Sequence, residues 1–332
     1  MSGHPENVAD RKGSLALIFV SALFLVPIAL LLALFIRESH KNIDFVNKEI
    51  AGLDYAQTVW PVITDVLSTQ GERLGVVANR WDKIRKAGEA NDREMGTLGA
   101  RVALGRAMSQ AGNAHQAAGR ILDAAIALLN TIDDGSNLTL DTDLESFYVM
   151  DSATVRLPAL AIHSLGLEGG DAIPESDSDV DTPPIVRRGS NAVVATFQAS
   201  LLAFDRSVTA VVRASGDPHP TLSTARNRID AIAATLIQAV GQDATGSANP
   251  AGGARVAALN QALIQAESRY WDIATAQLHH LLEARAARMQ RAQWNNLLAV
   301  VAVCAGIFLI VGLMAFSANR GLDKIAKVFR TK

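Results

Sequence analysis

The polar side chains best suited to chemistry lie in one predicted helix, and they are Glu145, Tyr148, Ser152 and Arg156. At 100° per residue these four positions fall within about 80° of one another, along the border of the apolar face of the helix. Arginine presents a planar fork that holds a carboxylate through two parallel hydrogen bonds. The set therefore predicts a binding site for a small carboxylate between helices. The alternative is a corner of a helical bundle at which Tyr148 packs and Arg156 is solvated.

Three residues on other predicted helices are candidates to face this set, and they are Tyr55, Arg73 and Tyr270. Their side chains supply further hydroxyl and guanidinium groups. The sequence contains no phosphate-binding loop, no nucleophile elbow, no HExxH motif and no paired-cysteine motif. We therefore predict a protein that is not an enzyme, with no catalytic residues and no cofactor.

Two patterns imitate metal sites, and we interpret neither as one. His279 and His280 are neighbours, so on a helix their side chains point about 100° apart and do not share a metal ion. The acidic run at 177–181 imitates the start of a calcium-binding EF-hand loop. Its sixth position is Thr182 instead of glycine, and its twelfth is Arg188 instead of glutamate. This pattern favours a solvated acidic linker.

Two uncharged apolar runs, residues 14–36 and 297–316, are each long enough to cross a membrane. About 20 helical residues at 1.5 Å each cover a hydrocarbon core of roughly 30 Å. The first run exceeds the apolar core of a cleaved signal peptide and continues directly into Arg37, which favours an uncleaved anchor. No run between the two is comparable, so the sequence predicts two transmembrane helices.

The cationic residues next to these runs predict the topology. Arg11 and Lys12 precede the first run, and five Lys or Arg residues follow the second. Such residues are enriched on the cytoplasmic side. We therefore expect residues 1–13 and 317–332 to be cytoplasmic tails, and residues 37–296 to form a large domain on the other side of the membrane.

The composition of residues 37–296 excludes some partners. This segment has six more acidic than basic residues, whereas nucleic acids and anionic lipid surfaces bind basic proteins. Cys304, the only cysteine in the chain, belongs to the second apolar run. The large domain is therefore expected to be held together by packing alone, without a disulfide.

A strict seven-residue apolar series runs through residues 41–86 and consists of Val46, Leu53, Trp60, Leu67, Leu74 and Trp81. A sustained period of 3.5 residues is typical of long helices that cross at shallow angles. We expect one helix over this stretch, with a bend at Pro61, because an interior proline removes a hydrogen bond.

The rest of the large domain also has helical periodicity. A second helix is predicted over 91–131, with its inward face at Leu98, Val102, Leu104, Met108, Ile121, Ala125 and Leu128 or Leu129. A third begins at a capping box of Thr142 and Glu145, and Pro158 interrupts it.

After a linker at about 166–184, two helices are expected at about 187–215 and 221–241. A long last helix continues into the second apolar run. No segment reads as a strand, so the predicted class is all-α, with about six helices outside the membrane.

Three segments resemble a known family: residues 49–55 (EIAGLDY), 136–151 (SNLTLDTDLESFYVMD) followed by RLP at 156–158, and 281–285 (LLEAR). They are similar to the helical bimodular sensor module of bacterial chemoreceptors, histidine kinases and diguanylate cyclases. The resemblance implies two stacked four-helix bundles in the periplasm and a homodimer in the bacterial inner membrane. It also implies a small ligand such as an organic acid or amino acid.

The resemblance ends after the second apolar run, since only 16 residues follow where the family continues into a signalling domain. We therefore expect a receptor-like protein that signals through its second membrane span to a separate cytoplasmic protein. Two alternatives remain: an envelope protein that has a structural or protein-docking role, and a truncated relic of a longer receptor.

Overall fold

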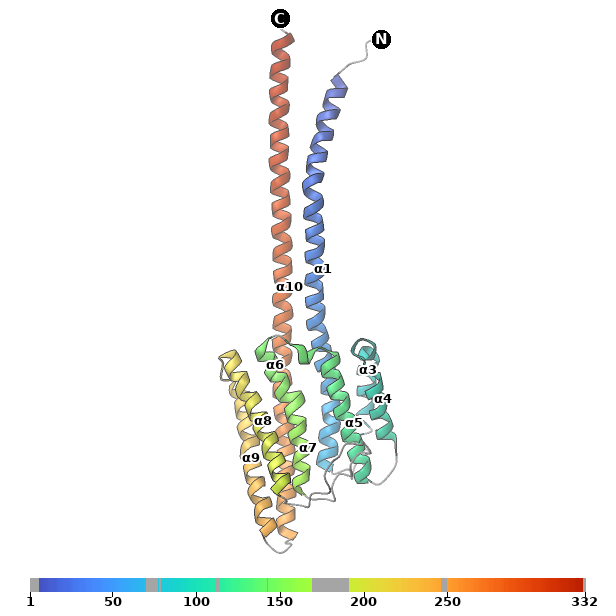
Figure 1. Cartoon of the computed structure of the whole chain (residues 1–332), viewed down its shortest axis with the longest axis vertical. Helices are drawn as coiled ribbons and strands as arrows, with labels where there is room; N and C mark the ends of the chain where they lie inside the picture. Colours follow the sequence, from blue (N-terminus) through green and yellow to red (C-terminus); the bar gives the residue numbers. More distant parts are fainter. Residues whose placement is uncertain are drawn as a thin grey trace. The chain divides into compact units, whose positions relative to one another are not determined.

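The structure is a computed structural model that describes residues 6–69, 77, 79–110, 114–141, 143–168, 191–245 and 250–330. Every regular element in these ranges is a helix, and no strand occurs among them (Figure 1). The predicted all-α class is therefore confirmed for the part of the chain that the structure describes.

The chain divides into two compact units. The rod unit comprises Met1–Phe45 and Arg285–Lys332, and the bundle unit comprises Val46–Ala284. Two long helices, α1 (Glu6–Thr69) and α10 (Pro250–Arg330), each contribute to both units. The predicted junction of the last helix with the second apolar run is thus confirmed, because α10 continues through it without interruption.

The rod unit contains the apolar residues that suit a membrane. Within Gly252–Ile310, α10 is long and apolar enough to cross a bilayer by length and composition, and its apolar stretch includes exposed Leu298 and Leu309. Residues 14–25 of the first predicted span lie outside the residues whose side chains are described. Among the described residues there is therefore one candidate span, and the two-span arrangement stays a prediction.

The seven-residue series forms the buried seam of α1 in the bundle unit. Val46, Leu53, Trp60 and Leu67 are each at most 2% exposed, as predicted. Leu74 lies outside the described residues. The prediction of one helix as far as residue 86 was wrong, because α1 ends at Thr69 and a new helix, α3 (Trp81–Met95), begins at the last position of the series.

The predicted second helix is divided between α3, α4 (Leu98–Ser109) and α5 (Ala114–Gly135). Gly96 ends α3 in the left-handed conformation (φ 71°), which glycine adopts without strain. Because of this break, the inward face of α4 differs from the face that one continuous helix would present. Leu98 and Val102 were therefore wrongly predicted to face inward, since they are 55% and 45% exposed, whereas Leu104 is buried as predicted.

The predicted third helix consists of three consecutive pieces, α6 (Leu144–Met150), the π-helical turn η2 (Asp151–Arg156) and α7 (Leu157–Glu168), and the short helix η1 (Leu138–Leu140) precedes them. The carboxylate of Asp143 caps α6 by accepting a hydrogen bond from the Glu145 amide at 3.1 Å. The capping box was predicted at Thr142, which lies outside the described residues.

Pro158 explains the π-helical turn. Its ring nitrogen has no hydrogen to donate to the Thr154 carbonyl, and in an α-helix its ring would collide with that carbonyl. A wider turn with i→i+5 hydrogen bonds relieves the collision. The proline therefore does not end the helix but changes its winding between Asp151 and Arg156.

Two further helices, α8 (Asn191–Ser215) and α9 (Pro220–Thr245), agree with the prediction to within a few residues. Of the predicted linker, residues 166–168 belong to α7, and the remainder lies outside the described residues. In the bundle unit, α3, α4 and α5 pack on one another, and α6, η2 and α7 pack on α8, which also contacts α9.

Figure 1 shows α3–α5 beside the part of α1 in the bundle unit, and α7–α9 beside the corresponding part of α10. The indole rings of Trp60 on α1 and Trp271 on α10 join the two groups. They stack with centroids 4.5 Å apart and planes 6° apart, and both are 2% exposed. Gln261 of α10 also donates a hydrogen bond to the Ser68 carbonyl of α1.

Candidate functional site

The structure brings two of the predicted site residues together in the core of the bundle unit. The Tyr270 hydroxyl on α10 donates to Ser152 Oγ of η2 at 2.8 Å, and both residues are fully buried. Ser152 Oγ in turn donates to the Val149 carbonyl at 2.8 Å. Phe204 of α8 contacts the Tyr270 ring edge to face, with centroids 4.8 Å apart. The pair therefore joins α10 to η2.

Burial is the main cause that raises the pKa of the Tyr270 phenol above its usual range, and the Ser152 hydrogen bond opposes it. The phenol is consequently neutral at physiological pH and acts as a hydrogen-bond donor. Its partner Ser152 donates its own hydroxyl proton to the Val149 carbonyl, so both hydroxyl groups donate a hydrogen bond.

The other three residues of the predicted set lie elsewhere. Arg156 is exposed, and its Nε lies 3.2 Å from Asp151 Oδ2. Tyr148 is half-buried, and its carbonyl accepts a hydrogen bond from Ser207 of α8. The prediction assumed 100° per residue, which does not hold through a π-helical turn. Ser152 therefore enters the core, while Arg156 does not accompany it.

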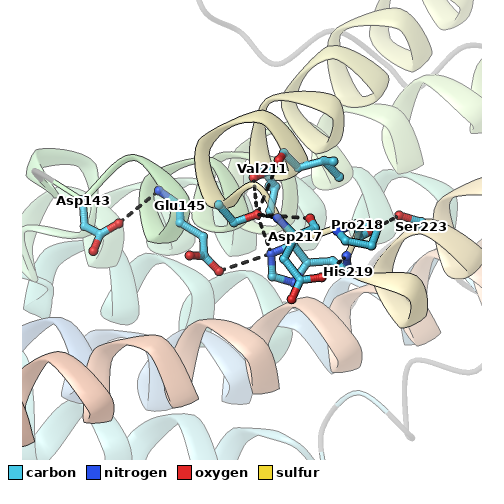
Figure 2. A network of polar contacts seen from close by, with 9 residues as sticks. Asp143, Glu145, Val211, Asp217, Pro218, His219 and Ser223 are labelled. Atoms are coloured by element: carbon cyan, nitrogen blue, oxygen red, sulfur yellow. Dashed lines mark hydrogen bonds and ion pairs between the residues drawn. The ribbon is translucent and has the colours of Figure 1, made fainter.

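Glu145 belongs to a separate polar network at the turn between α8 and α9 (Figure 2). His219 Nε2 lies 3.2 Å from Glu145 Oε1 and 3.0 Å from Ser215 Oγ. The His219 backbone has a positive φ of 41°, and its amide donates to Asp217 Oδ1. These contacts hold the turn against the start of α6, which assigns Glu145 a structural role.

Tyr55 lies in a second buried cluster, on the α3–α4 side of the bundle unit. Arg101 binds Asp92 through Nη2 at 2.6 Å and Nε at 2.8 Å, and Thr97 Oγ1 donates to the same carboxylate at 2.7 Å. Gly88 makes the close approach possible, because a Cβ there would lie 2.2 Å from Arg101 Cδ and 2.8 Å from the Tyr55 hydroxyl.

The Tyr55 hydroxyl is buried and lies near Thr97, with no hydrogen bond of good geometry among the residues that the structure describes. Burial, followed by the charge of Asp92, raises its pKa. Arg73, its predicted companion, lies outside the described residues. The arginine beside Tyr55 in the structure is Arg101, which the sequence reasoning missed because α4 was not recognised as a separate helix.

Sequence reasoning also missed two buried carboxyl groups, Glu267 on α10 and Asp133 on α5. Glu267 is 0% exposed and Asp133 is 2% exposed. Within the described residues, neither side chain has a hydrogen bond of good geometry. A signal was present, since Glu267 precedes Trp271 by four residues and Asp133 follows Leu129 by four, so both acids interrupt an apolar seam.

No protein-family model matches the sequence, and no curated protein and no solved structure matches it either. The resemblance to periplasmic sensor modules therefore stays a prediction that depends on the three segments quoted above. Inferences about function must come from the buried polar groups and from the helices that carry them.

Proposed function

We propose that this protein is a receptor-like membrane sensor, in which a chemical change in the bundle unit alters the position of α10 and so passes a signal across the membrane. The observation that carries the proposal is the continuity of α10. One uninterrupted helix contains the buried Glu267 and Tyr270 and also the apolar stretch that suits a bilayer.

Helix geometry supports transmission over this distance. At 1.5 Å per residue, the segment of α10 from Glu267 to Leu297 is about 45 Å long. Displacements of 1–2 Å are typical of helices that carry signals. A stimulus shifts such an equilibrium only by its difference in affinity for the two states, typically about 1–3 kcal/mol.

In this proposal the protein is a homodimer in the bacterial inner membrane, with two spans, cytoplasmic termini and a periplasmic bundle unit. The cations that flank the two apolar runs support this topology. A small solute is the stimulus, and a separate cytoplasmic signalling protein receives the signal. The exposed, Asp151-paired Arg156 gives little support to an acidic ligand at the predicted site.

Reporter fusions test the topology. A reporter fused after Lys332 should be active only when it functions in the cytoplasm. One inserted between residues 169 and 184 should be active only when it functions outside. The opposite pattern at either position would contradict the proposal.

Distance measurements test the transmission. Spin labels at the exposed Gln57 of α1 and Ala276 of α10, in a Cys304→Ser background, report the spacing of the two helices in full-length protein in nanodiscs. A panel of organic acids and amino acids should contain a compound that shifts this spacing by about 1–2 Å. If no compound shifts the spacing or stabilises the protein, the protein-docking alternative is the better account. The exposed Leu98 and Val102 would then be its first candidate surface.

A further inference from the structure

The stacked indole rings of Trp60 on α1 and Trp271 on α10 form an aromatic layer, and the buried Glu267 lies one helical turn from it on α10. Trp271 is four residues further along α10 and therefore on the same face, and it stacks on Trp60 of α1. Both Glu267 oxygens are buried without a hydrogen-bond partner in the described part of the chain. Burial of an ionised carboxylate without a partner has a large desolvation penalty, so Glu267 favours its neutral, protonated form.

Among the described residues, no charged group around this layer forms an ion pair with Glu267. The charged groups on the elements packed against this part of α10 are either paired or exposed. Asp65 pairs with Arg80, Asp151 with Arg156, and Asp205 with Arg226. The exposed cations of α8 and α9 are Arg206, Arg213 and Arg228. On α10 itself, Arg269 and Asp272 are exposed. Burial is the only cause that shifts the pKa of Glu267, and it raises that pKa well above the usual value.

Asp133 is the second uncompensated carboxyl group. The Thr154 hydroxyl of η2 lies near it and favours the charged form, but this hydroxyl donates to the Met150 carbonyl at 3.2 Å. Asp134, its exposed neighbour, favours the neutral form. Burial is the largest cause, and the pKa of Asp133 is raised to about 7.

The charged groups on the elements packed against α5 are either paired or exposed. On α3 and α4, Asp92 binds Arg101, and on η2, Asp151 binds Arg156. Arg93 of α3 and Arg106 of α4 are exposed. Among the described residues, no cation pairs with Asp133.

Asp133 lies against η2, and Glu267 is linked to the same element through its own helix. Asp133 approaches Thr154, whereas Tyr270, three residues after Glu267 on α10, donates to Ser152. Ser152 and Thr154 are both buried in the π-helical turn. A change at Asp133 therefore acts on this turn directly, and a change at Glu267 acts on the segment of α10 that is hydrogen-bonded to it.

We propose that the bundle unit senses the proton concentration on its side of the membrane, with Glu267 and Asp133 as the proton-binding groups. The inference rests on the proposed function and adds the proton as a second stimulus beside the small solute. In acid both groups are neutral, and the layer between α1, η2 and α10 is closed. As the pH rises they ionise, the carboxylates draw in water, and α10 loosens from α1 and η2.

Tryptophan emission tests this inference in the full-length protein in nanodiscs. The chain has four tryptophans, so Trp81→Phe and Trp294→Phe leave only the stacked pair as the reporter. Titration from about pH 5 to 9 should show a transition in emission, because buried acids titrate several units above their ordinary range. The component due to Asp133 should be centred at about pH 7.

Isosteric amides fix the neutral form and provide the variants. Glu267→Gln and Asp133→Asn should each remove part of the transition, and the double variant should show the low-pH emission at every pH. Asp134→Asn, at the exposed neighbouring acid, is the matched control. It should keep the full amplitude of the transition and move the Asp133 component slightly to lower pH, because the Asp134 charge favours neutral Asp133.

Two results would overturn the inference: no transition in the parent protein, or a full transition in the double variant. Neither result affects the proposed function, because the reporter fusions and the solute panel test that function at constant pH. Conversely, a pH transition in a protein with the opposite topology would uphold the proton-binding groups and contradict the membrane sensor.

Discussion

Two regions of the bundle unit hold buried carboxyl groups in opposite ways. Beside Tyr55, Asp92 is 10% exposed and receives hydrogen bonds from Arg101 and Thr97. Around η2, Asp133 and Glu267 are buried more completely and have no cationic partner among the described residues. The first region pairs its carboxylate with a cation and so fixes the structure, whereas burial raises the pKa of the carboxyl groups in the second, which suits a response to pH.

The largest effect expected in this comparison is the pH dependence of stability due to Asp133. Its pKa is about 7 in the folded protein and 3.8 when unperturbed, so stability is lost as the pH rises between these values, by about 4 kcal/mol in total. From pH 5 to 8 the free energy of unfolding should fall by about 3 kcal/mol in the parent relative to Asp133→Asn.

Chemical unfolding of the full chain at both pH values, followed by tryptophan emission, measures this difference. His163 contributes with the opposite sign, because burial lowers its pKa and its stabilisation is lost as the pH falls. The comparison with Asp133→Asn cancels that contribution. Equal pH dependence in the two proteins would show that Asp133 is ionised in the fold at both pH values.

Removal of Arg101, the cationic partner of Asp92, should lower the free energy of unfolding by about 3 kcal/mol. Arg101→Leu removes the cationic partner of the Asp92 side chain, and the loss lies at the low end for buried pairs because Asp92 keeps 10% exposure. Arg106→Leu, at an exposed arginine of the same helix, is the control and should change unfolding by less than about 0.5 kcal/mol. Similar losses in both variants would mean that the Asp92–Arg101 pair does not stabilise the fold.

Gly88→Ala should lower the free energy of unfolding by about 2 kcal/mol, because it disturbs the cluster of Asp92, Arg101 and Tyr55. The added Cβ would lie 2.2 Å from Arg101 Cδ, and Asp92 holds that side chain in place. Gly99→Ala is a matched control on α4, where a Cβ meets nothing within 4 Å, so it should stabilise the helix by up to about 1 kcal/mol. Thermal melting of the two variants should therefore shift in opposite directions.

Tyr270→Phe should lower the free energy of unfolding by about 1 kcal/mol, because it removes one neutral hydrogen bond between α10 and η2. Tyr148→Phe should have almost no effect, since in the described part of the chain the Tyr148 hydroxyl makes no hydrogen bond. If the two variants unfold alike, the Tyr270–Ser152 contact does not join these elements energetically.

Arg156→Ala should have the smallest effect, below about 0.5 kcal/mol, because its pair with Asp151 is partly solvated. The same variant tests the carboxylate site predicted from the sequence. If an organic acid stabilises the parent protein and Arg156→Ala abolishes that effect, the predicted site is correct in spite of the exposed position of the arginine.

Much of the fold could be predicted because it depends on local periodicity. The seam from Val46 to Leu67 and the positions of α8, α9 and α10 follow directly from apolar spacing. The turn at Asn79 and Arg80 and the rotation of α4 could not be predicted in this way. They depend on how short helices meet their neighbours, which spacing along one helix does not record.

The candidate site was predicted less well than the fold, because a small change in winding alters which side chains meet. Tyr270 and Ser152 were both identified, and they touch. Arg156 was assigned to the same site on the assumption of uniform α-helical geometry, which η2 violates. Glu267 was overlooked because an acid in an apolar seam was not treated as a signal in its own right.

The π-helical turn also restricts how this chain can change length during evolution. It accommodates one residue more than a regular α-helix would between α6 and α7. Deletion of one residue from Asp151–Arg156, together with replacement of Pro158, would therefore return the segment to regular α-helix and keep Leu157 and Leu160, both fully buried, on the face that packs against α8. Deletion of one residue within α7 would instead turn the rest of that helix by about 100°. Single-residue gaps should therefore be more frequent at the π-helical turn of divergent homologues than within α6 or α7.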